Sequence, residues 1–257
     1  VHFVCLDSYL SDRSVAGPML TWLRQDLAQT DRDWIIAFWH HPPYSRGGHD
    51  SDDDPFQTEM RERALPVLED YGVDLVLTGH SHVYERSFLL DGHHGFSWTL
   101  QPAMVRDAGM GRPGAPYRKP AGGMGSRGGT VYVVCGCSGQ GGEESVERHP
   151  AVAVPLGGFG SLMVEIDGLV LNARFLRPSG EIGDEFAIDK SVPGPVGPRL
   201  DAAARTRRAR PRPARAGPSR RRAPPRRGPR APRPRAARSC RSVRRPRARH
   251  DAGRRRS

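Results

Sequence analysis

The 257-residue sequence contains no run of 18 apolar residues, which excludes a membrane-spanning helix of ordinary length. Cysteine is scarce: Cys5, Cys135, Cys137 and Cys240 do not have the spacing of a disulfide framework or a complete zinc site. Cys135 and Cys137 flank one glycine after an apolar segment and could form half of a soft-metal site. We interpret them instead as small structural thiols.

Charge is distributed very unevenly along the chain. The formal net charge of +12 would ordinarily indicate a nucleic-acid or acidic-surface partner. Residues 199–257, however, hold 24 arginines against two aspartates, a net charge of +22, and residues 1–198 hold 16 basic and 26 acidic side chains, a net charge of −10. The basic character therefore belongs to the tail, and the acidic charge of residues 1–198 argues against nucleic-acid binding elsewhere.

Residues 191–257 form a Pro/Arg-rich tail without aromatic residues or helical or strand periodicity, which predicts disorder. Three interpretations are open. The tail could be an arm that binds nucleic acid or an anionic surface, because clustered arginine neutralises phosphate without a fold. It could be a solvated tail without a partner. We favour the third, a frameshift product of a GC-rich gene, because the composition changes abruptly; an intact reading frame on resequencing would contradict it.

Strand and helix patterns alternate through the first 77 residues. Apolar runs predict strands, and an apolar stripe with i+3 and i+4 spacing predicts each helix. The strands are Val1–Leu6, Trp34–Trp39 and Val73–Leu77, and the helices are Pro18–Gln29 and Phe56–Tyr71. This βαβαβ order predicts a parallel sheet with right-handed crossovers.

Shorter strand patterns follow Ser87. They predict an antiparallel sheet packed beside the first, and so a fold between the α/β and α+β classes. A Gly- and Pro-rich stretch, Met104–Gly129, is expected to be a loop. The predicted strands are Phe88–Leu90, Gly95–Leu100, Thr130–Cys135, Ser161–Ile166 and Leu169–Leu176.

Histidines directly follow two of the predicted parallel strands. His40 comes after Trp34–Trp39, and His80 and His82 come after Val73–Leu77. Strand spacing would put His80 and His82 on one face, at the carboxyl edge where open α/β sheets bind ligands. Neutral imidazole is a common metal ligand, so the pattern suggests a metal site, although a histidine at a strand end can also be a polar cap.

The stretch Gly79-His80-Ser81-His82-Val83-Tyr84-Glu85-Arg86-Ser87, with His40 upstream, resembles the last two motifs of the calcineurin-like metallophosphoesterases, specifically the purple acid phosphatase branch. The resemblance covers about residues 1–190. It implies that residues 1–190 are the C-terminal portion of a four-layer αββα sandwich catalytic domain. Further matching segments are Gly129–Val134, Gly139–Gly142, Gly158–Ser161 and Asp184–Asp189.

The same resemblance implies a hydrolase of phosphate monoesters that uses hydroxide activated by two metal ions, Fe, Zn or Mn. It assigns His40 and His80 to the second metal and His82 to the first. It also assigns His49, in the loop Ser45–Asp50, to phosphate contact or protonation of the leaving alcohol, with a plain surface histidine as the alternative.

Neighbouring polar residues are interpreted as structural. His41 would point away from the metal if strand alternation continued past His40. Tyr84 is expected to pack in the core and Glu85-Arg86 to form a buried ion pair. His93-His94 flank a turn at Asp91-Gly92 and are expected to face solvent.

The family's earlier motifs, an Asp, Gly-Asp-x-x-Tyr and Gly-Asn-His-Glu, do not occur in this sequence. Without them the bridging carboxylate is absent, and three imidazoles cannot hold a dinuclear centre. The sheet would also have an uncovered edge. We therefore expect the chain to be the C-terminal part of a catalytic domain, and by itself to lack part of the active site.

Two other functions stay open. One is a phosphodiesterase or nucleotidase with the same metal core, and the other is a non-catalytic remnant with an Arg-rich arm that binds nucleic acid. The resemblance favours secretion, and the sequence leaves a signal peptide and the oligomeric state open.

Overall fold

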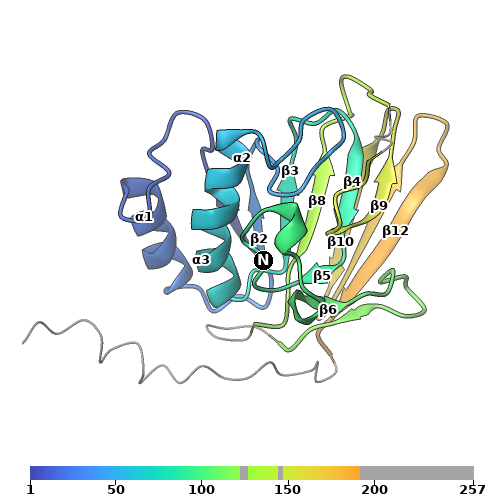
Figure 1. The fold of residues 1–257 in the computed structure, drawn as a ribbon. Helices are drawn as coiled ribbons and strands as arrows, with labels where there is room; N and C mark the ends of the chain where they lie inside the picture. The colour runs from blue at the N-terminus through green and yellow to red at the C-terminus, as the bar shows by residue number, and fades with distance from the viewer. Residues whose placement is uncertain (122–126, 144–146, 192–257) are drawn as a thin grey trace, which may run out of the picture. The chain divides into compact units, whose positions relative to one another are not determined.

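The structure is a computed structural model that describes residues 1–121, 127–143 and 147–191 (Figure 1). All of these residues lie in one compact unit. The tail predicted to be disordered, apart from Ser191, lies outside the described residues, and so does the proposed nucleic-acid arm.

A six-stranded sheet carries the histidine motifs. In spatial order its strands are β1 (His2–Cys5), β2 (Ile35–Phe38), β3 (Leu75–Thr78), β8 (Val131–Cys135), β4 (Tyr84–Ser87) and β9 (Val152–Leu156). The first four are parallel, which confirms the predicted parallel sheet, and β4 is antiparallel to both β8 and β9. We expected β8 in the second sheet, but its fully buried Val131–Val134 run suits the centre of a parallel one.

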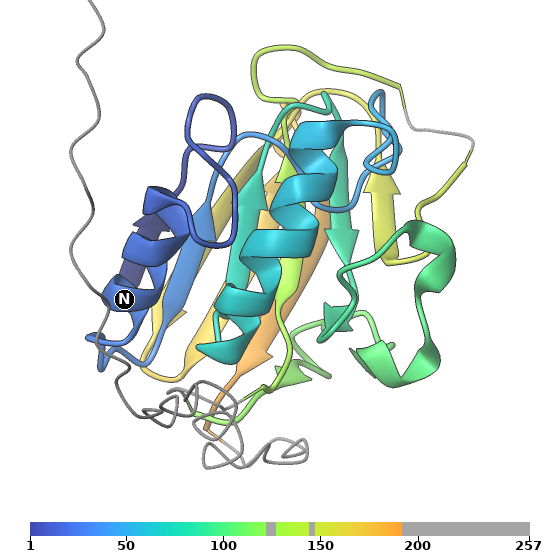
Figure 2. The ribbon, with the colours of Figure 1, turned by 60° about the vertical axis from the view of Figure 1, so that its left-hand side comes forward.

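Helices cover one face of this sheet (Figures 1 and 2). They are α1 (Pro18–Leu27), α2 (Pro55–Glu59), the π-helical turn η1 (Met60–Ala64) and α3 (Leu65–Asp70). The last three form the helix predicted over residues 56–71, with one widened turn in which the Leu65 amide donates to the Met60 carbonyl. Pro66 explains the turn, because proline has no N–H for the regular helical ladder.

A second sheet packs against the other face. It consists of β10 (Ser161–Asp167), β11 (Val170–Leu176), β12 (Ile182–Asp189) and β7 (Tyr117–Arg118). The pair β10–β11 is antiparallel as predicted; β12, which was not predicted as a strand, is antiparallel to β11, and β7 is parallel to β12. Three layers of the expected sandwich are thus described, and no outer helical layer occurs among the described residues.

Several short elements differ from the sequence prediction. Residues 95–100 contain the 3-10 turn η2 (Ser97–Thr99) instead of a strand, because the amide and hydroxyl of Thr99 both bond back to the Phe96 carbonyl. The expected loop after Met104 contains β6 (Val105–Asp107), which pairs with β5 (Leu89–Leu90), and it also contains β7. The 3-10 turn η3 (Pro102–Met104) precedes β6, and β4 and β9 were not predicted.

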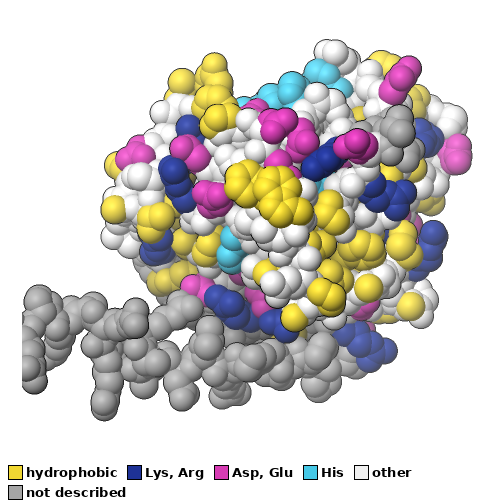
Figure 3. All heavy atoms as spheres, viewed as in Figure 1, with side chains coloured by type: hydrophobic (Ala, Val, Ile, Leu, Met, Phe, Trp, Pro, Cys, Tyr) yellow, Lys and Arg dark blue, Asp and Glu magenta, His cyan; other side chains and the backbone are white. Residues whose placement is uncertain are grey.

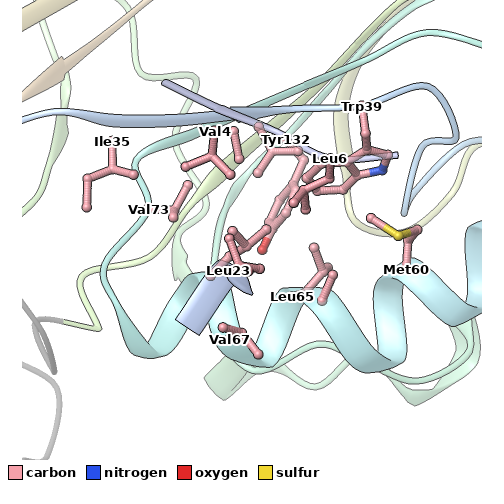
Figure 4. Close-up of a cluster of buried hydrophobic side chains, with 14 of the residues drawn as sticks. Val4, Leu6, Leu23, Ile35, Trp39, Met60, Leu65, Val67, Val73 and Tyr132 are labelled. Carbon is pink, nitrogen blue, oxygen red and sulfur yellow. The ribbon is translucent and has the colours of Figure 1, made fainter. Parts of the chain in front are cut away.

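Two apolar cores lie on opposite faces of the six-stranded sheet. Ile35 and Ala37 face the helices, whereas Ile36 faces the second sheet, as expected from strand alternation. Figure 4 shows part of the helix-side core, with Leu23 and Leu65 directed toward the sheet. No described helix is long and apolar enough to cross a membrane.

Tyr84 is buried and stacks on Phe175, with ring centroids 4.3 Å apart, as expected. Glu85 and Arg86 are also buried, but they do not pair with each other, so that prediction was wrong. Adjacent strand residues point to opposite faces. Arg86 therefore binds Asp184 at 2.6 Å between the sheets, whereas Glu85 accepts a hydrogen bond from the Arg46 amide at 3.1 Å.

Candidate metal and phosphate site

His40 and His80 lie just beyond the carboxyl ends of two adjacent parallel strands, β2 and β3. The chains stay paired there, since the Gly79 amide donates to the His40 carbonyl at 3.0 Å. His40 Nε2 is 3.1 Å from His80 Nδ1. The predicted convergence of these two histidines is therefore present in the structure. Figure 3 shows histidine and acidic side chains gathered along the upper edge of the view.

The separation of these two nitrogens suits a shared metal ion. Two imidazole nitrogens about 2.0–2.1 Å from one tetrahedral ion would lie about 3.3 Å apart. His40, His41 and His80 each offer one ligand atom within 4.8 Å of the others. His80 Nε2 is buried without a hydrogen-bond partner. This cluster has the donors and the spacing that a metal centre requires.

His41 belongs to this cluster, so the prediction that it points away was wrong. Strand β2 ends at Phe38, and strand alternation does not extend to the histidines. The His41 ring centroid lies 4.6 Å from that of His80, and its Nδ1 is 2.8 Å from Ser8 Oγ. Burial lowers the pKa of His41 to about 4, so its ring is neutral at pH 7.

His80 has an unusual backbone and a nearby carboxylate. It is the one non-glycine residue with positive φ, 66°, among those described, a conformation that clusters at functional sites. Burial lowers its pKa, and the charges of His49 and His40 add to that effect. Asp54 Oδ2 lies 3.5 Å from His80 Nε2, while Asp54 Oδ1 caps α2 through the Phe56 amide. We did not predict Asp54 as a site residue; the one available signal was its Asp-Pro helix start.

His49 lies against His80, with stacked ring centroids 4.0 Å apart. It also lines a surface cavity of about 410 Å³. The remaining lining residues, Gly48, Asp50, Asp53, Asp54, Pro55 and Phe56, include three carboxylates. These acidic groups favour a cation and would repel a phosphate unless cations were present. The structure thus brings the predicted catalytic histidine to the predicted metal ligands.

His82 is not part of the three-histidine cluster. Strand β3 ends at Thr78 and the left-handed His80 turns the chain, so the expected shared face of His80 and His82 does not form. Its positive charge would still lower the pKa of His80, and its carbonyl accepts from the Gly142 amide at 2.7 Å. The assignment of His82 to a metal stays a prediction.

The loop that carries His49 is clamped to the turn that carries His80. Ser45 Oγ bonds to Ser81 Oγ at 2.7 Å, and the Arg46 amide bonds to Glu85. A Cβ added at Gly47 would lie 2.1 Å from Val83, so the two segments touch closely there. Relative movement of His49 and His80 is therefore restricted.

His93 does not face solvent as predicted, whereas His94 is partly exposed. His93 is fully buried and stacks on Tyr44, with ring centroids 5.3 Å apart, near the buried His149. His94 bonds to Glu69 at 2.8 Å. Segments distant in sequence enclose the His93 ring, which a local turn signal cannot reveal.

Gly136 packs directly against the turn that carries His80 and Ser81, so adding a methyl group there should lower the stability of the fold strongly. A Cβ at Gly136 would lie 2.2 Å from the Ser81 carbonyl oxygen, and backbone atoms cannot move aside cheaply. We expect Gly136→Ala to lower the free energy of unfolding by roughly 1–3 kcal/mol, measured by urea denaturation.

Gly139→Ala is the matched control, because a Cβ there meets nothing within 4 Å. It should change stability by less than about 0.5 kcal/mol. Equal effects of the two substitutions would contradict the close packing.

The site lies within a recognisable family segment. The model of the calcineurin-like phosphoesterases matches residues 3–84, which include every histidine of the cluster and both His49 and His82. Over this segment, about a third of the chain, the protein resembles the calcineurin-like phosphoesterases. The resemblance inferred from the sequence motifs is thereby confirmed.

Curated relatives match about a third of the chain. Purple acid phosphatase 15 of Arabidopsis thaliana is 39% identical over 92 residues, which are 34% of this chain and 16% of the relative. An acid phosphatase of Aspergillus ficuum is 43% identical over 87 residues, 33% of this chain and 13% of the relative. The chain thus spans only 16% and 13% of the length of these two relatives.

Solved structures support the fold beyond the calcineurin-like segment. Purple acid phosphatase PPD1 from yellow lupin (Lupinus luteus) seeds matches 73% of this chain and 30% of its own, with a TM-score of 0.55 and 19% identity. GAP50, the anchor in the inner membrane complex of Plasmodium, matches 80% of this chain and 54% of its own, with a TM-score of 0.50 and 15% identity. The fold is therefore a metallophosphoesterase fold.

Proposed function

We propose that the chain supplies part of the active site of a metal-dependent phosphomonoesterase. His40 and His80 would bind one metal ion, His82 a second, and His49 would contact the phosphate or protonate the leaving group. The 3.1 Å approach of His40 Nε2 to His80 Nδ1, inside the calcineurin-like segment, carries this proposal. Fe, Zn and Mn are the metals that suit imidazole ligands at such a site.

The residues of the cluster are prepared for metal binding. Burial lowers the pKa of both His41 and His80, which favours the neutral ring with one nitrogen free to bind a metal ion. His41 touches Ser8 and stacks on Phe56, with ring centroids 4.8 Å apart, and we assign it to positioning the other two rings. Metal ions at such a site supply water activation and charge neutralisation for phosphoryl transfer.

His49 is placed to act on a substrate. Its ring stacks on His80 and also lines the 410 Å³ cavity, so a phosphate ester in that cavity would meet His49 beside one proposed metal ligand. A histidine in this position can donate a proton to a departing alcohol. Clamping of the His49 loop by Ser81 and Glu85 would hold this geometry.

We further propose that the remaining metal ligands come from residues beyond those described here, in the same or another polypeptide. Among the described residues, the cluster holds histidines alone, and the nearby Asp54 already caps α2. The apolar face of edge strand β1 is also uncovered: Phe3 is 63% exposed, and Phe38 of the neighbouring strand β2 is 39% exposed. Additional strands that cover these residues would bring further side chains near the carboxyl ends of β2 and β3.

Metal titration tests the site directly. The full 257-residue chain should bind Zn²⁺ or Co²⁺, and His40→Ala or His80→Ala should weaken binding by at least about 100-fold. His2→Ala is the matched control, because His2 begins β1 at the opposite end of the sheet and pairs with Asp26. Equal affinity in wild type, His80→Ala and His2→Ala would overturn the metal site.

Hydrolysis of p-nitrophenyl phosphate tests whether this chain alone holds a complete active site. If further ligands are required, the metal-loaded chain should turn over no faster than His80→Ala. Turnover that His80→Ala abolishes would contradict the missing ligands but support the metal site. Its ratio to bis(p-nitrophenyl) phosphate hydrolysis would then separate monoesterase from diesterase activity.

A further inference from the structure

Two thiols lie beside the metal-site turn, and neither has a role in the function proposed above. Cys135 ends β8, and Cys137 follows after Gly136; both are free cysteines. We propose that Cys135 and Cys137 form a reversible disulfide, and that closing it shifts the turn that carries His80. The disulfide is independent of the proposed function, whereas its effect on metal affinity rests on that function.

The two cysteine side chains face the same core. Cys137 is buried in the core between the two sheets, and the partly exposed Cys135 packs against that core, so both side chains point the same way. The neighbouring thiol lowers the pKa of Cys137 to about 7, while Cys137 and burial raise the pKa of Cys135. Thiolate is the form that attacks a disulfide, and the lowered pKa of Cys137 favours it.

Disulfide closure requires movement at Gly136. Residues two apart on a strand are roughly 6.7 Å apart at Cα, near the upper end of the range of about 4.4–6.8 Å found for disulfides. Closure should therefore bend the chain at Gly136, which has no side chain to resist it. An exposed or strained disulfide of this kind is readily reduced.

Gly136 transmits this movement to the metal-site turn. Its amide donates to the Val83 carbonyl at 3.3 Å, and a Cβ on it would lie 2.2 Å from the Ser81 oxygen. Ser81 lies between His80 and His82. Because packed backbone segments cannot interpenetrate, bending Gly136 should displace the turn and the His80 ring.

A small organic disulfide such as oxidised glutathione is a sufficient oxidant. One thiol of the pair loses its proton, and the resulting thiolate attacks one sulfur of the small disulfide, which forms a mixed disulfide and releases one thiol. The second cysteine loses its proton, attacks the sulfur of the first and releases the second thiol. The two protein thiols lose two electrons and two protons, and the small disulfide becomes two thiols.

Mass spectrometry tests the disulfide. After oxidation and alkylation of the full chain, the tryptic peptide of residues 128–148, which contains both cysteines, should lose about 2 Da and take up no alkylating agent. Cys135→Ser and Cys137→Ser should abolish this change, and Cys5→Ser should not. A peptide that carries only a mixed disulfide, or two alkylated thiols, would overturn the proposal.

Histidine NMR tests the coupling without metal. Oxidation should shift the ring signals of His80, identified by loss in His80→Ala, and leave those of His2 unchanged. Disulfide formation with unchanged His80 signals would overturn the coupling. Shifted signals in a chain that binds no Zn²⁺ in either state would support the coupling and contradict the proposed metal site.

Zn²⁺ affinity tests the consequence for metal binding. We expect oxidation to weaken binding at least fivefold, because the displaced His80 no longer faces His40. By linkage, Zn²⁺ should then stabilise the reduced cysteine pair. The midpoint potential of the disulfide should rise by about 30 mV for each tenfold difference in Zn²⁺ affinity between the two forms. Equal Zn²⁺ affinity of the two forms would overturn this consequence.

Discussion

Replacing Asp74 with alanine is expected to lower the free energy of unfolding by about 3–5 kcal/mol. Asp74 is fully buried and lies between two fully buried lysines, 2.7 Å from Lys119 Nζ and 2.8 Å from Lys190 Nζ. It also accepts the Ile35 amide at 2.9 Å. Removal of the carboxylate leaves two ammonium groups and one amide without their buried partner.

Other contacts hold both lysine side chains in their buried positions. Lys119 donates to the carbonyls of Gly72 and Val73, and Lys190 lies 4.4 Å from the centre of the Trp34 ring. Burial lowers the pKa of Lys119 to about 8 although the Asp74 carboxylate raises it, so the Lys119 ammonium is stabilised by Asp74. The network joins the start of β3 to residues after β7 and β12, so its loss affects both sheets.

Urea denaturation followed by tryptophan fluorescence measures this effect. Asp31→Ala is the matched control, because the Asp31 side chain is 94% exposed, and its change should stay within about 0.5 kcal/mol. The loss of stability in Asp74→Asn should lie between those of Asp74→Ala and Asp31→Ala, since the amide oxygen of asparagine can still accept from the Ile35 amide. An Asp74→Ala chain as stable as the control would contradict the proposed importance of the buried network.

The described domain is expected to lose stability steeply as the pH falls from about 6.5 to about 4. Burial lowers the pKa of His93 to about 4 and that of His149 to about 3, from an ordinary value of 6.5. Between those values the unfolded chain binds protons that the folded chain does not. Each histidine should therefore contribute full stability above pH 6.5 and cost about 1.4 kcal/mol per pH unit below it.

Several charged groups lie around this pair. Asp52 raises the pKa of both rings, while Arg61 lowers both and Arg46 lowers that of His149. Burial changes the pKa of each ring more than any of these charges does. Both ring nitrogens of His93 and Nε2 of His149 lack a hydrogen-bond partner in the described residues, so nothing compensates a buried imidazolium.

Urea midpoints measured from pH 7 to pH 4.5 test this prediction. His93→Phe keeps the ring that stacks on Tyr44 but cannot take up a proton, so its stability should fall with a slope shallower by about 1.4 kcal/mol per pH unit. Parallel curves for wild type and His93→Phe would contradict the prediction.

Sequence patterns predicted the first half of the fold well, because its elements depend on local periodicity. The buried runs before His40 and His80 became adjacent parallel strands, and the stripe of Leu20, Leu23 and Leu27 became the buried face of α1. The second half was predicted less well. Strand β8 lies between β3 and β4, a pairing decided by contacts between distant segments.

The same distinction applies to the candidate site. The proximity of His40 and His80 could be predicted, because the carboxyl ends of parallel strands meet at one edge of the sheet. The positions of His41 and His82 followed from where each strand ends and from the left-handed backbone of His80, which strand alternation could not predict. Asp54 entered the site only because α2 begins next to the histidine cluster.

The sequence by itself determined the family resemblance, the parallel βαβαβ core and the edge at which two candidate metal-ligating histidines meet, because side-chain periodicity follows from local backbone geometry. The tertiary structure alone decided which histidines form one cluster, why His93 is buried, and how Cys135 and Cys137 lie against the His80 turn. Residues in turns have no periodicity, so contacts with distant segments determine where their side chains lie.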